Sequence, residues 1–337
     1  MELTLINYDE LTSLFCSLGG RFDNASIRDG VYGLGIFSVE PGKRVRVSAP
    51  EHLLFLTDNL DVDSGCKLRL VSNAGMPKAV EQFFELYHAT VGWDRAIESV
   101  RLSQASWFAI PFSVKEILLK MGVLMNSFSE PNPQVLLSRY CRERRISYKK
   151  NKVDQFFLMP MVELANHSSQ GKPFSIGGGV KVEAIVNDEL YVDYGSHTDP
   201  FQQFVAYNFS SKSEFIHSIP ISLSRRNLGS IFISSNPPSG YGANPSFLIK
   251  NGDIHISHLE IYNSKEREKP LKSFINLMKA YGLRENDSHA LFNLIIEQNK
   301  NAFLHLNILL NGSDFSLVEK MKLMVTHQLE GIENSYR

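Results

Sequence analysis

The sequence has few cysteines, almost no net charge and no long apolar run. Cys16, Cys66 and Cys141 lie far apart and form no Cys-x-x-Cys pair, which argues against a disulfide framework or a cysteine zinc site. The 35 basic residues nearly balance the 36 acidic ones, so no field of one sign would attract nucleic acid or an anionic membrane. No segment reaches the length needed to cross a bilayer, and no secretory pattern opens the chain. We therefore expect a cytosolic (cytoplasmic) monomer without nucleic-acid, membrane or metal partners.

Several common enzyme motifs are also missing. The sequence contains no P-loop, no His-Glu-x-x-His and no Gly-x-Ser-x-Gly. It therefore lacks the motifs that usually indicate nucleotide hydrolysis, zinc proteolysis or serine hydrolysis. Gly33 and Gly35 begin a Gly-x-Gly pattern, but Ser38 stands where a dinucleotide fingerprint needs its third glycine. Taken alone, these two glycines indicate a turn between strands.

The apolar residues follow two periods along the chain, one typical of strands and one typical of helices. Alternating stretches predict strands over residues 31–56 and 174–194, and strands or a linker over residues 216–262. Helical spacing is found over residues 76–128 and again beyond residue 265. With 43% hydrophobic and 21% charged residues, the chain can form two or three domains with substantial cores.

Three helix ends can be predicted from capping residues. Ser113 and Glu116 have the spacing of a capping box at a helix start. Asp287 stands where it can cap the long apolar helix that follows. Gly282 follows the helical pattern that begins near Leu271, so we expect it just after the end of that helix.

An Asn-His pair and a later strand motif carry the most specific signal. Asn166 and His167 follow Glu163 by three and four residues. About twenty residues later comes Glu189-Leu190-Tyr191-Val192-Asp193-Tyr194-Gly195. In this order, and with Gly33 to Gly35 and the Ser138-Arg139 pair upstream, the chain resembles the SET-domain protein methyltransferases. Within that family it is most similar to the Rubisco large-subunit methyltransferase group.

The resemblance implies an α+β fold with a β-rich SET core of short sheets, a helical insert and a C-terminal helical lobe. The first part of the core would be residues 1–75, and the helical insert would be residues 76–130. Residues 131–215 would complete the core with the Asn-His and ELYVDYG motifs. Residues 216–337 would form a strand linker and a helical lobe that docks the substrate.

The resemblance also implies a binding site for S-adenosylmethionine. Its expected cofactor-binding residues are Gly33, Leu34, Gly35, Arg139, Glu163, Asn166 and His167. Arg139 suits the cofactor carboxylate because its guanidinium can contact both oxygens. The amide of Asn166 offers a donor and an acceptor, and the main chain of His167 would contact the adenine. Glu163 has an alternative role, in which it braces the Asn-His turn.

The implied reaction is methyl transfer to a side-chain nitrogen of a protein substrate. Tyr194 would be the catalytic hydroxyl beside the transferring methyl, while Tyr207 and Phe209 would form part of the channel wall. Asn208 stands between these two aromatics where the group has glycine. Lysine is the favoured acceptor; a histidine-directed enzyme and an inactive SET-scaffold binding protein are the alternatives.

A basic run lies between the insert and the Asn-His pair. Residues 139–152 hold seven basic residues and one acidic residue. Such a run is usually a solvated helix end. The functional alternative is a docking patch for an acidic protein substrate, which would raise the association rate more than the affinity.

Overall fold

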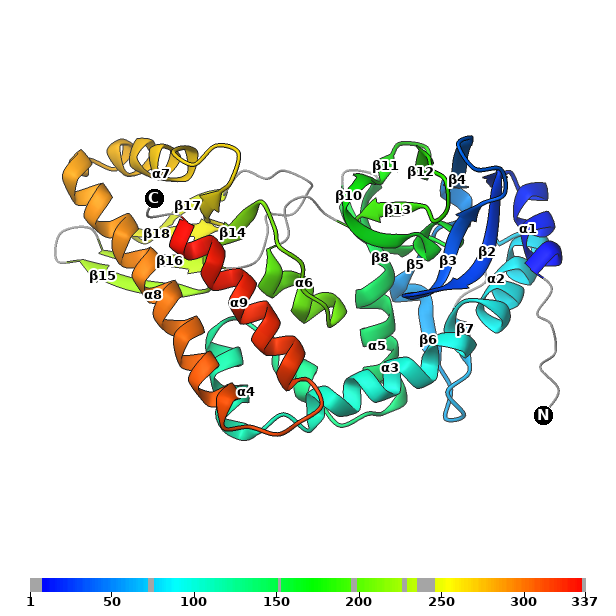
Figure 1. Cartoon of the computed structure of the whole chain (residues 1–337), viewed down its shortest axis with the longest axis horizontal. Coiled ribbons are helices and arrows are strands. Elements are labelled where there is room, and N and C mark those ends of the chain that lie inside the picture. Colours follow the sequence, from blue (N-terminus) through cyan, green and yellow to red (C-terminus); the bar gives the residue numbers. More distant parts are fainter. Residues whose placement is uncertain are drawn as a thin grey trace. The chain divides into compact units, whose positions relative to one another are not determined.

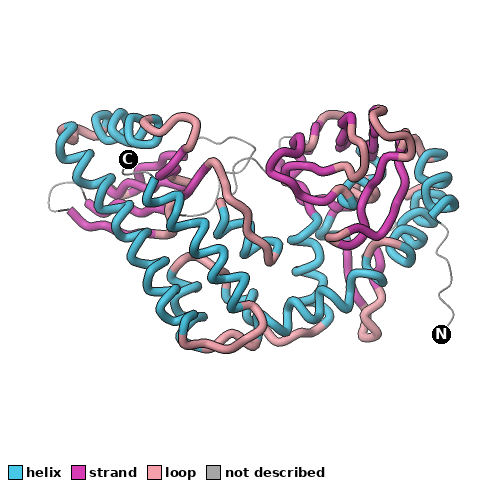
Figure 2. Tube along the Cα trace, viewed as in Figure 1, coloured by secondary structure: helices cyan, strands magenta, loops and turns pink. Residues whose placement is uncertain are grey.

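The computed structural model describes residues 8–71, 76–150, 153–194, 199–225, 229–234 and 246–334 (Figure 1). Within these ranges the chain is α+β, as predicted, with helices and several small sheets (Figure 2). It divides into two compact units. Unit 1 consists of Met1–Gln104 and Glu130–Gly195, and unit 2 of Ala105–Ser129 and Ser196–Arg337. Each unit has its own apolar core.

Unit 1 is built from short sheets. Its largest sheet has the antiparallel order β1 (Arg21–Asp23), β4 (Arg44–Pro50), β12 (Gly179–Ile185), β11 (Ser175–Ile176). A three-stranded sheet has the order β5 (Phe55–Leu56), β9 (Val153–Leu158), β8 (Arg145–Lys150). The two-stranded pairs are β2 (Ala25–Gly30) with β3 (Gly33–Ser38), β6 (Leu60–Val62) with β7 (Leu68–Leu70), and β10 (Asn166–Pro173) in parallel with β13 (Tyr191–Asp193).

Strand β4 explains why unit 1 has a core on one face of its main sheet. Val45, Val47 and Ala49 are buried, whereas Arg44 is exposed and Arg46 is half-buried. This is the period-two alternation expected from the sequence, because successive side chains of a strand point to opposite faces. Helices α1 (Tyr8–Ser17), α2 (Lys78–Thr90) and α5 (Pro133–Arg144) and the first part of α3 (Trp93–Phe108) complete the unit.

Unit 2 combines helices with a second group of strands. Its helices are α4 (Phe112–Lys120), α6 (Pro200–Tyr207), α7 (Lys269–Ala280), α8 (Glu285–Asn311) and α9 (Val318–Asn334). Its strands form a sheet of order β15 (Ile221–Arg225), β16 (Gly229–Ser234), β18 (Asp253–Ser257), β17 (Ser246–Lys250), and a pair of β14 (Phe215–His217) with β19 (Glu260–Asn263). Helix α9 packs on α8 and α6, and α4 packs on α8.

The predicted insert over residues 76–130 is helical. It contains α2, α3, α4 and the 3-10 turn Met125–Phe128. The insert is divided between the two units, however, because residues 105–129 share the core of unit 2. The boundaries between the units fall inside two of the four predicted segments, residues 76–130 and 131–215. The four segments stay a prediction.

Two of the three predicted helix ends are wrong. Helix α4 begins at Phe112, because Pro111 holds the preceding backbone extended (φ −58°, ψ 147°). Ser113 therefore lies inside the helix. Helix α8 begins at Glu285, so Asp287 lies in its first turn, where an acidic side chain favours the helix dipole. Gly282 is confirmed as the residue beyond α7: it has φ 79°.

Candidate active site

The glycine strand β3 lies beside the segment that precedes β13. The main-chain N–H of Leu190 donates to the carbonyl of Ile36 at 2.7 Å, and that of Ser38 donates to the carbonyl of Asp188 at 2.8 Å. These bonds join residues 150 and 154 positions apart in the sequence. They bring Gly33, Leu34 and Gly35 next to the start of the ELYVDYG motif.

Asn166 connects these two segments through its side-chain amide. Its Nδ2 donates to the carbonyl of Leu34 at 3.2 Å and to Oε1 of Glu189 at 2.7 Å. The second carboxylate oxygen of Glu189 accepts from the hydroxyl of Tyr191 at 2.7 Å. Glu189 is 7% exposed, so these are charge-assisted hydrogen bonds away from bulk water.

Gly35 is required by this arrangement. A Cβ atom at this position would lie 2.5 Å from Oε1 of Glu189 and 3.1 Å from Nδ2 of Asn166. The first distance is shorter than real Cβ contacts allow, so a side chain here would displace the Glu189 carboxylate. Gly33 is needed for a different reason: its φ of 96° is a conformation that L side chains rarely adopt.

His167 and Tyr194 are also brought together. The main-chain N–H of Tyr194 donates to Nδ1 of His167 at 3.2 Å, and the two rings lie 5.2 Å apart between centroids. The hydroxyl of Tyr194 donates to the carbonyl of Ala165 at 3.0 Å, while Phe174 stacks on the tyrosine ring at 6.2 Å. Burial lowers the pKa of His167, and the charge of Asp193 opposes this shift only in part. The imidazole is therefore neutral at pH 7 and its Nδ1 is an acceptor.

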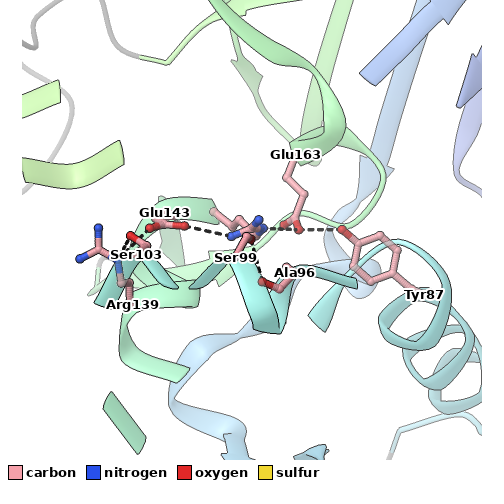
Figure 3. Close-up of polar contacts among 8 residues, drawn as sticks. Tyr87, Ala96, Ser99, Ser103, Arg139, Glu143 and Glu163 are labelled. Atoms are coloured by element: carbon pink, nitrogen blue, oxygen red, sulfur yellow. Dashed lines mark hydrogen bonds and ion pairs between the residues drawn. The ribbon is translucent and has the colours of Figure 1, made fainter. Parts of the chain in front are cut away.

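Glu163 and Arg139 belong to a second polar cluster of unit 1 (Figure 3). The hydroxyl of Tyr87 on α2 donates to Oε1 of Glu163 at 2.6 Å, and Nε of Arg144 lies 3.8 Å from the same oxygen. Arg144 also pairs with Glu143 at 3.3 Å. Nε of Arg139 in turn lies 3.1 Å from Glu143.

This cluster fixes the helices to the turn that leads into Asn166. Nε of Arg139 also donates to Oγ of Ser103 on α3 at 2.8 Å, and the Arg139 side chain is 1% exposed. Burial lowers the pKa of Arg139 to about 10 despite the nearby Glu143. Burial likewise raises the pKa of Glu163, although Arg144 and the Tyr87 hydroxyl oppose the shift. Tyr87 and Arg144 thus hold the Glu163 side chain three residues before Asn166.

Tyr207 and Phe209 lie in unit 2, at the end of α6. Their rings stack with centroids 5.7 Å apart and an interplanar angle of 24°. Asn208 between them is left-handed, with φ 58° and ψ 23°. Because asparagine tolerates this conformation better than most residues, it can stand where the resembled group has glycine.

The sequence interpretation missed the side chains that join the motifs. The sequence indicates Glu189 only as part of a strand motif, yet its carboxylate accepts hydrogen bonds from Asn166 and Tyr191. The available signal is a carboxylate directly before the Leu190-Tyr191-Val192 stretch. In the first part of the basic run, Arg139 is buried, Arg142 and Arg144 are half-buried and Arg145 is exposed. Both interpretations of the whole run stay predictions. Gly195 of the ELYVDYG motif lies outside the described residues, as do residues 235–245 of the segment 216–262.

Two further findings concern metals and membranes. Within the described ranges, no group of three or more His, Cys, Asp or Glu side chains is arranged to hold a metal ion. Among the same residues, no helix combines the length and apolar character needed for a membrane span. The three cysteines are free thiols: Cys16 is exposed and Cys141 is buried.

Comparisons with known proteins give matches among solved structures. No protein-family model matches the chain, and no curated protein matches it. The SET domain of LSMT bound to lysine and AdoHcy is 11% identical, with a TM-score of 0.46; the match covers 97% of this chain and 89% of that one. Rubisco LSMT bound to AdoMet is also 11% identical, with a TM-score of 0.47 and coverage of 97% and 90%. Rubisco LSMT bound to sinefungin and monomethyllysine is 13% identical, with a TM-score of 0.42 and coverage of 97% and 89%.

Proposed function

We propose that this chain is an S-adenosylmethionine-dependent methyltransferase of the SET class that methylates a lysine side chain of a protein. The observation that supports the proposal is the convergence of its motif residues in unit 1. Asn166 is hydrogen-bonded to Leu34 and to Glu189, and its neighbour His167 accepts a hydrogen bond from Tyr194. Residues that are far apart in the sequence, and that occur in the family's order, thus meet at one place.

The residues of this cluster fit the proposed cofactor. The Nδ2 group of Asn166 points to Leu34 and Glu189, which leaves Oδ1 as the atom that can accept from a ligand ammonium group. The nearby Glu189 carboxylate adds negative charge that favours a cation. A Cβ atom on Gly33 would have no neighbour within 4 Å, so a ligand can approach the main chain there. Gly33, Leu34, Gly35, Asn166 and His167 are the proposed cofactor contacts.

Arg139 and Glu163 have a different role in this proposal. The guanidinium of Arg139 contacts Glu143 and Ser103. The carboxylate of Glu163 contacts Tyr87 and Arg144. We assign to them the positioning of α5 and of the turn before Asn166. Their assignment as cofactor ligands stays a sequence-based prediction.

Tyr194 is the residue that we assign to the transfer step. When bound, S-adenosylmethionine supplies an electrophilic methyl group on a sulfonium. The Tyr194 hydroxyl donates its hydrogen to the carbonyl of Ala165. The lone pairs of the tyrosine oxygen can therefore accept a hydrogen bond from an N–H of the substrate amine. Accepting that hydrogen bond orients the nitrogen lone pair for an in-line approach.

The acceptor must also lose a proton. A free lysine with a pKa near 10.4 is almost fully charged at pH 7, and the roughly 3.4-unit gap corresponds to about 4.6 kcal/mol. Apolar surroundings reduce this cost because burial disfavours the ammonium. Phe174 beside Tyr194 provides such a surface in unit 1. For Tyr207 and Phe209, which lie in unit 2, the role of channel wall stays a sequence-based prediction.

The proposal is tested by cofactor binding and methyl transfer with the full chain. Calorimetry with S-adenosylmethionine measures binding. Incubation with methyl-tritiated S-adenosylmethionine and libraries of short lysine-centred or histidine-centred peptides measures transfer. We expect binding and label on lysine peptides, and loss of label in Tyr194→Phe.

The other outcomes identify the alternatives. Label confined to histidine peptides would identify a histidine-directed enzyme. Cofactor binding without label on either library or on a cell lysate would favour an inactive SET-scaffold protein. A folded wild type that does not bind S-adenosylmethionine would contradict the proposal.

A further inference from the structure

The turn between β9 and β10 has an unusual backbone. Met161 has φ 69° and ψ −42°, close to a γ-turn conformation that is rare and strained. The 3-10 turn Val162–Leu164 follows, and Ala165 then leads directly into Asn166. Strained backbone of this kind persists where neighbouring contacts hold it in place. The position of Asn166 thus depends on the contacts that hold this turn.

Glu163 supplies such a contact from the middle of the turn (Figure 3). Its side chain is 3% exposed. Its Oε1 accepts from the hydroxyl of Tyr87 on α2 at 2.6 Å and lies 3.8 Å from Nε of Arg144 on α5. A buried carboxylate needs such donors and charges in place of water. The turn is therefore tied to two helices of unit 1.

The same turn supplies two groups of the candidate site. The carbonyl of Ala165 accepts from the hydroxyl of Tyr194 at 3.0 Å. Nδ2 of Asn166 donates to Oε1 of Glu189 at 2.7 Å. Because Ala165 and Asn166 directly follow the 3-10 turn that contains Glu163, a shift of this turn would move both groups.

We propose that Tyr87 and Arg144 are positioning residues that hold Ala165 and Asn166 in place through the carboxylate of Glu163. The inference rests on the proposed function, which assigns Asn166 to cofactor binding. Tyr87 and Arg144 act on the turn and not on the ligand. Helix α2 thereby contributes to cofactor binding although it holds none of the proposed contacts.

The charge of Glu163 distinguishes this role from simple packing. The titratable and charged side chains that act on Glu163 are Tyr87 on α2 and Tyr140, Cys141 and Arg144 on α5. Burial raises the pKa of both tyrosines and of Cys141, so these groups stay neutral below pH 9, and Arg144 stays charged. Burial also raises the pKa of Glu163, whereas Arg144 and the Tyr87 hydroxyl lower it. Removing the hydroxyl therefore raises the pKa of Glu163 further, and the carboxylate loses its charge at a higher pH.

Amide exchange tests the contact without any ligand. The main-chain N–H groups of residues 163–165 donate to carbonyls of residues 159–162 at 3.0–3.4 Å, so their exchange reports on opening of the turn. We expect these amides to exchange about tenfold faster in Tyr87→Phe, the size of one lost buried hydrogen bond. Hydrogen exchange followed by mass spectrometry measures the effect.

Two further variants complete this test. Tyr140→Phe is the matched control, because Tyr140 is also 0% exposed and its hydroxyl has no hydrogen-bond partner among the described residues. It should leave exchange in the turn unchanged. Glu163→Gln changes the same contact from the carboxylate side. It removes the charge that pairs with Arg144, so the turn should again exchange faster.

The functional readout is the affinity for S-adenosylmethionine at pH 6 and pH 8.5. Each variant is compared with the wild type at the same pH, so that titration of the cofactor itself cancels. In Tyr87→Phe we expect a loss of about threefold at pH 8.5 that grows to about tenfold at pH 6, because the variant loses the carboxylate charge first. Glu163→Gln lacks this charge at every pH, so its loss should not grow on acidification. Tyr140→Phe should bind as the wild type does at both pH values.

Unchanged exchange in both Tyr87→Phe and Glu163→Gln would overturn the inference. A loss of affinity in Tyr87→Phe that is equal at the two pH values would overturn it as well, since it would indicate a packing defect and not a link through the carboxylate. A wild type that does not bind S-adenosylmethionine would instead contradict the proposed function. The exchange experiment would still decide whether Tyr87 holds the turn.

Discussion

At the scale of single residues, Asn166 makes the connection on which the candidate site depends. Replacing it with alanine removes both hydrogen bonds from Nδ2, to Leu34 and to the buried Glu189. We expect Asn166→Ala to weaken S-adenosylmethionine binding by about 1–3 kcal/mol, because buried polar partners lose their hydrogen bonds. Calorimetry measures this loss. Asn187→Ala, at an exposed position of the same unit, is the matched control and should bind normally. Equal affinities in the two folded variants would remove Asn166 from the cofactor site.

Tyr194 allows a test that separates transfer from binding. Tyr194→Phe removes one oxygen, and the ring contacts with His167 and Phe174 can persist. The hydrogen bond to Ala165 is lost, together with the proposed acceptor for the amine. We expect transfer to fall about 10²-fold or more, the usual effect of losing a positioned catalytic group, with little change in cofactor affinity. Single-turnover rates on a labelled peptide measure the effect. A rate equal to that of the wild type would exclude the catalytic role.

The residues that a sequence reveals are those with a fixed spacing. Asn166, His167 and Tyr194 were predicted as a group, and the structure brings them together with Gly33 to Gly35. Glu189 and Tyr87 could not be assigned in this way, because their roles depend on partners 23 and 76 positions away. Such contacts arise from tertiary packing, which spacing within one motif does not encode. The local environment of Glu163 was likewise set by Tyr87 and Arg144 on two different helices.

At the scale of elements, α2 contributes a buried histidine with a pH-dependent effect. His88 is 4% exposed, and its Nδ1 accepts from the main-chain N–H of Trp93 at 3.3 Å. Burial, assisted by the charge of Arg144, lowers the pKa of His88 from 6.5 to about 3. The unfolded state therefore binds a proton first as the pH falls. The stability associated with neutral His88 is present above pH 6.5 and is lost on acidification towards pH 3.

His88→Gln tests this contribution. Between pH 6 and pH 5 the wild type should lose about 1.2 kcal/mol more unfolding free energy than the variant. One pH unit corresponds to about 1.4 kcal/mol for a fully linked proton, and the unfolded imidazole is not yet fully protonated at pH 6. Urea unfolding followed through the Trp93 indole signal reports on unit 1. Parallel stability curves for the two proteins would show that His88 does not titrate in this range. A steeper loss in the variant would reverse the predicted sign.

Element types were easier to predict than element ends. The alternation of β4 and the helical spacing in α7 follow directly from the burial of one face. Helix starts are harder to predict. Helix α4 begins directly after a proline and α8 begins with acidic residues in its first turn, so neither helix starts at the residue expected to cap it. The hairpin of β11 and β12 was predictable, since Gly177, Gly178 and Gly179 all have positive φ. Glycine marks such turns because few other residues adopt that backbone.

At the scale of the whole molecule, the division into units does not follow the order of the sequence. Unit 2 takes residues 105–129 from the helical insert and joins them to residues 196–337. Trp107, Val114 and Leu118 are fully buried in the same core as residues of α8 and α9. Apolar periodicity predicts that each helix buries one face, but it does not indicate which partner covers that face. The sequence-based boundary at residue 76 reflects a change of pattern within unit 1.

The C-terminal helices complete the core of unit 2, and this determines what truncation should do. Helices α7, α8 and α9 bury Phe274, Met278, Phe303, Leu306, Met321 and Met324 at 0–1% exposure. Each such side chain stabilises a fold by roughly 1.5–3 kcal/mol, so together they match or exceed the 5–15 kcal/mol typical of a domain. Polar contacts would be lost as well. Asn299 accepts from the N–H of Ile219 at 2.9 Å, and Gln328 donates to the buried Asp199 at 3.2 Å.

A chain ending at Tyr262 should therefore lose the folded state of unit 2. We expect fast amide exchange throughout β15, β16 and β18, and rapid proteolysis after residue 199, because Asp199 and Ile219 lose the partners that satisfy them. Full-length Asn299→Ala is the milder control and should keep these strands protected while lowering the unfolding midpoint.

The competing interpretation is that the helices only dock the protein substrate. It requires the shortened chain to keep protected strands and normal S-adenosylmethionine affinity while losing methylation of intact protein. Hydrogen exchange of the strand amides decides between the two, since protection equal to that of the full chain would show that the helices are dispensable for folding.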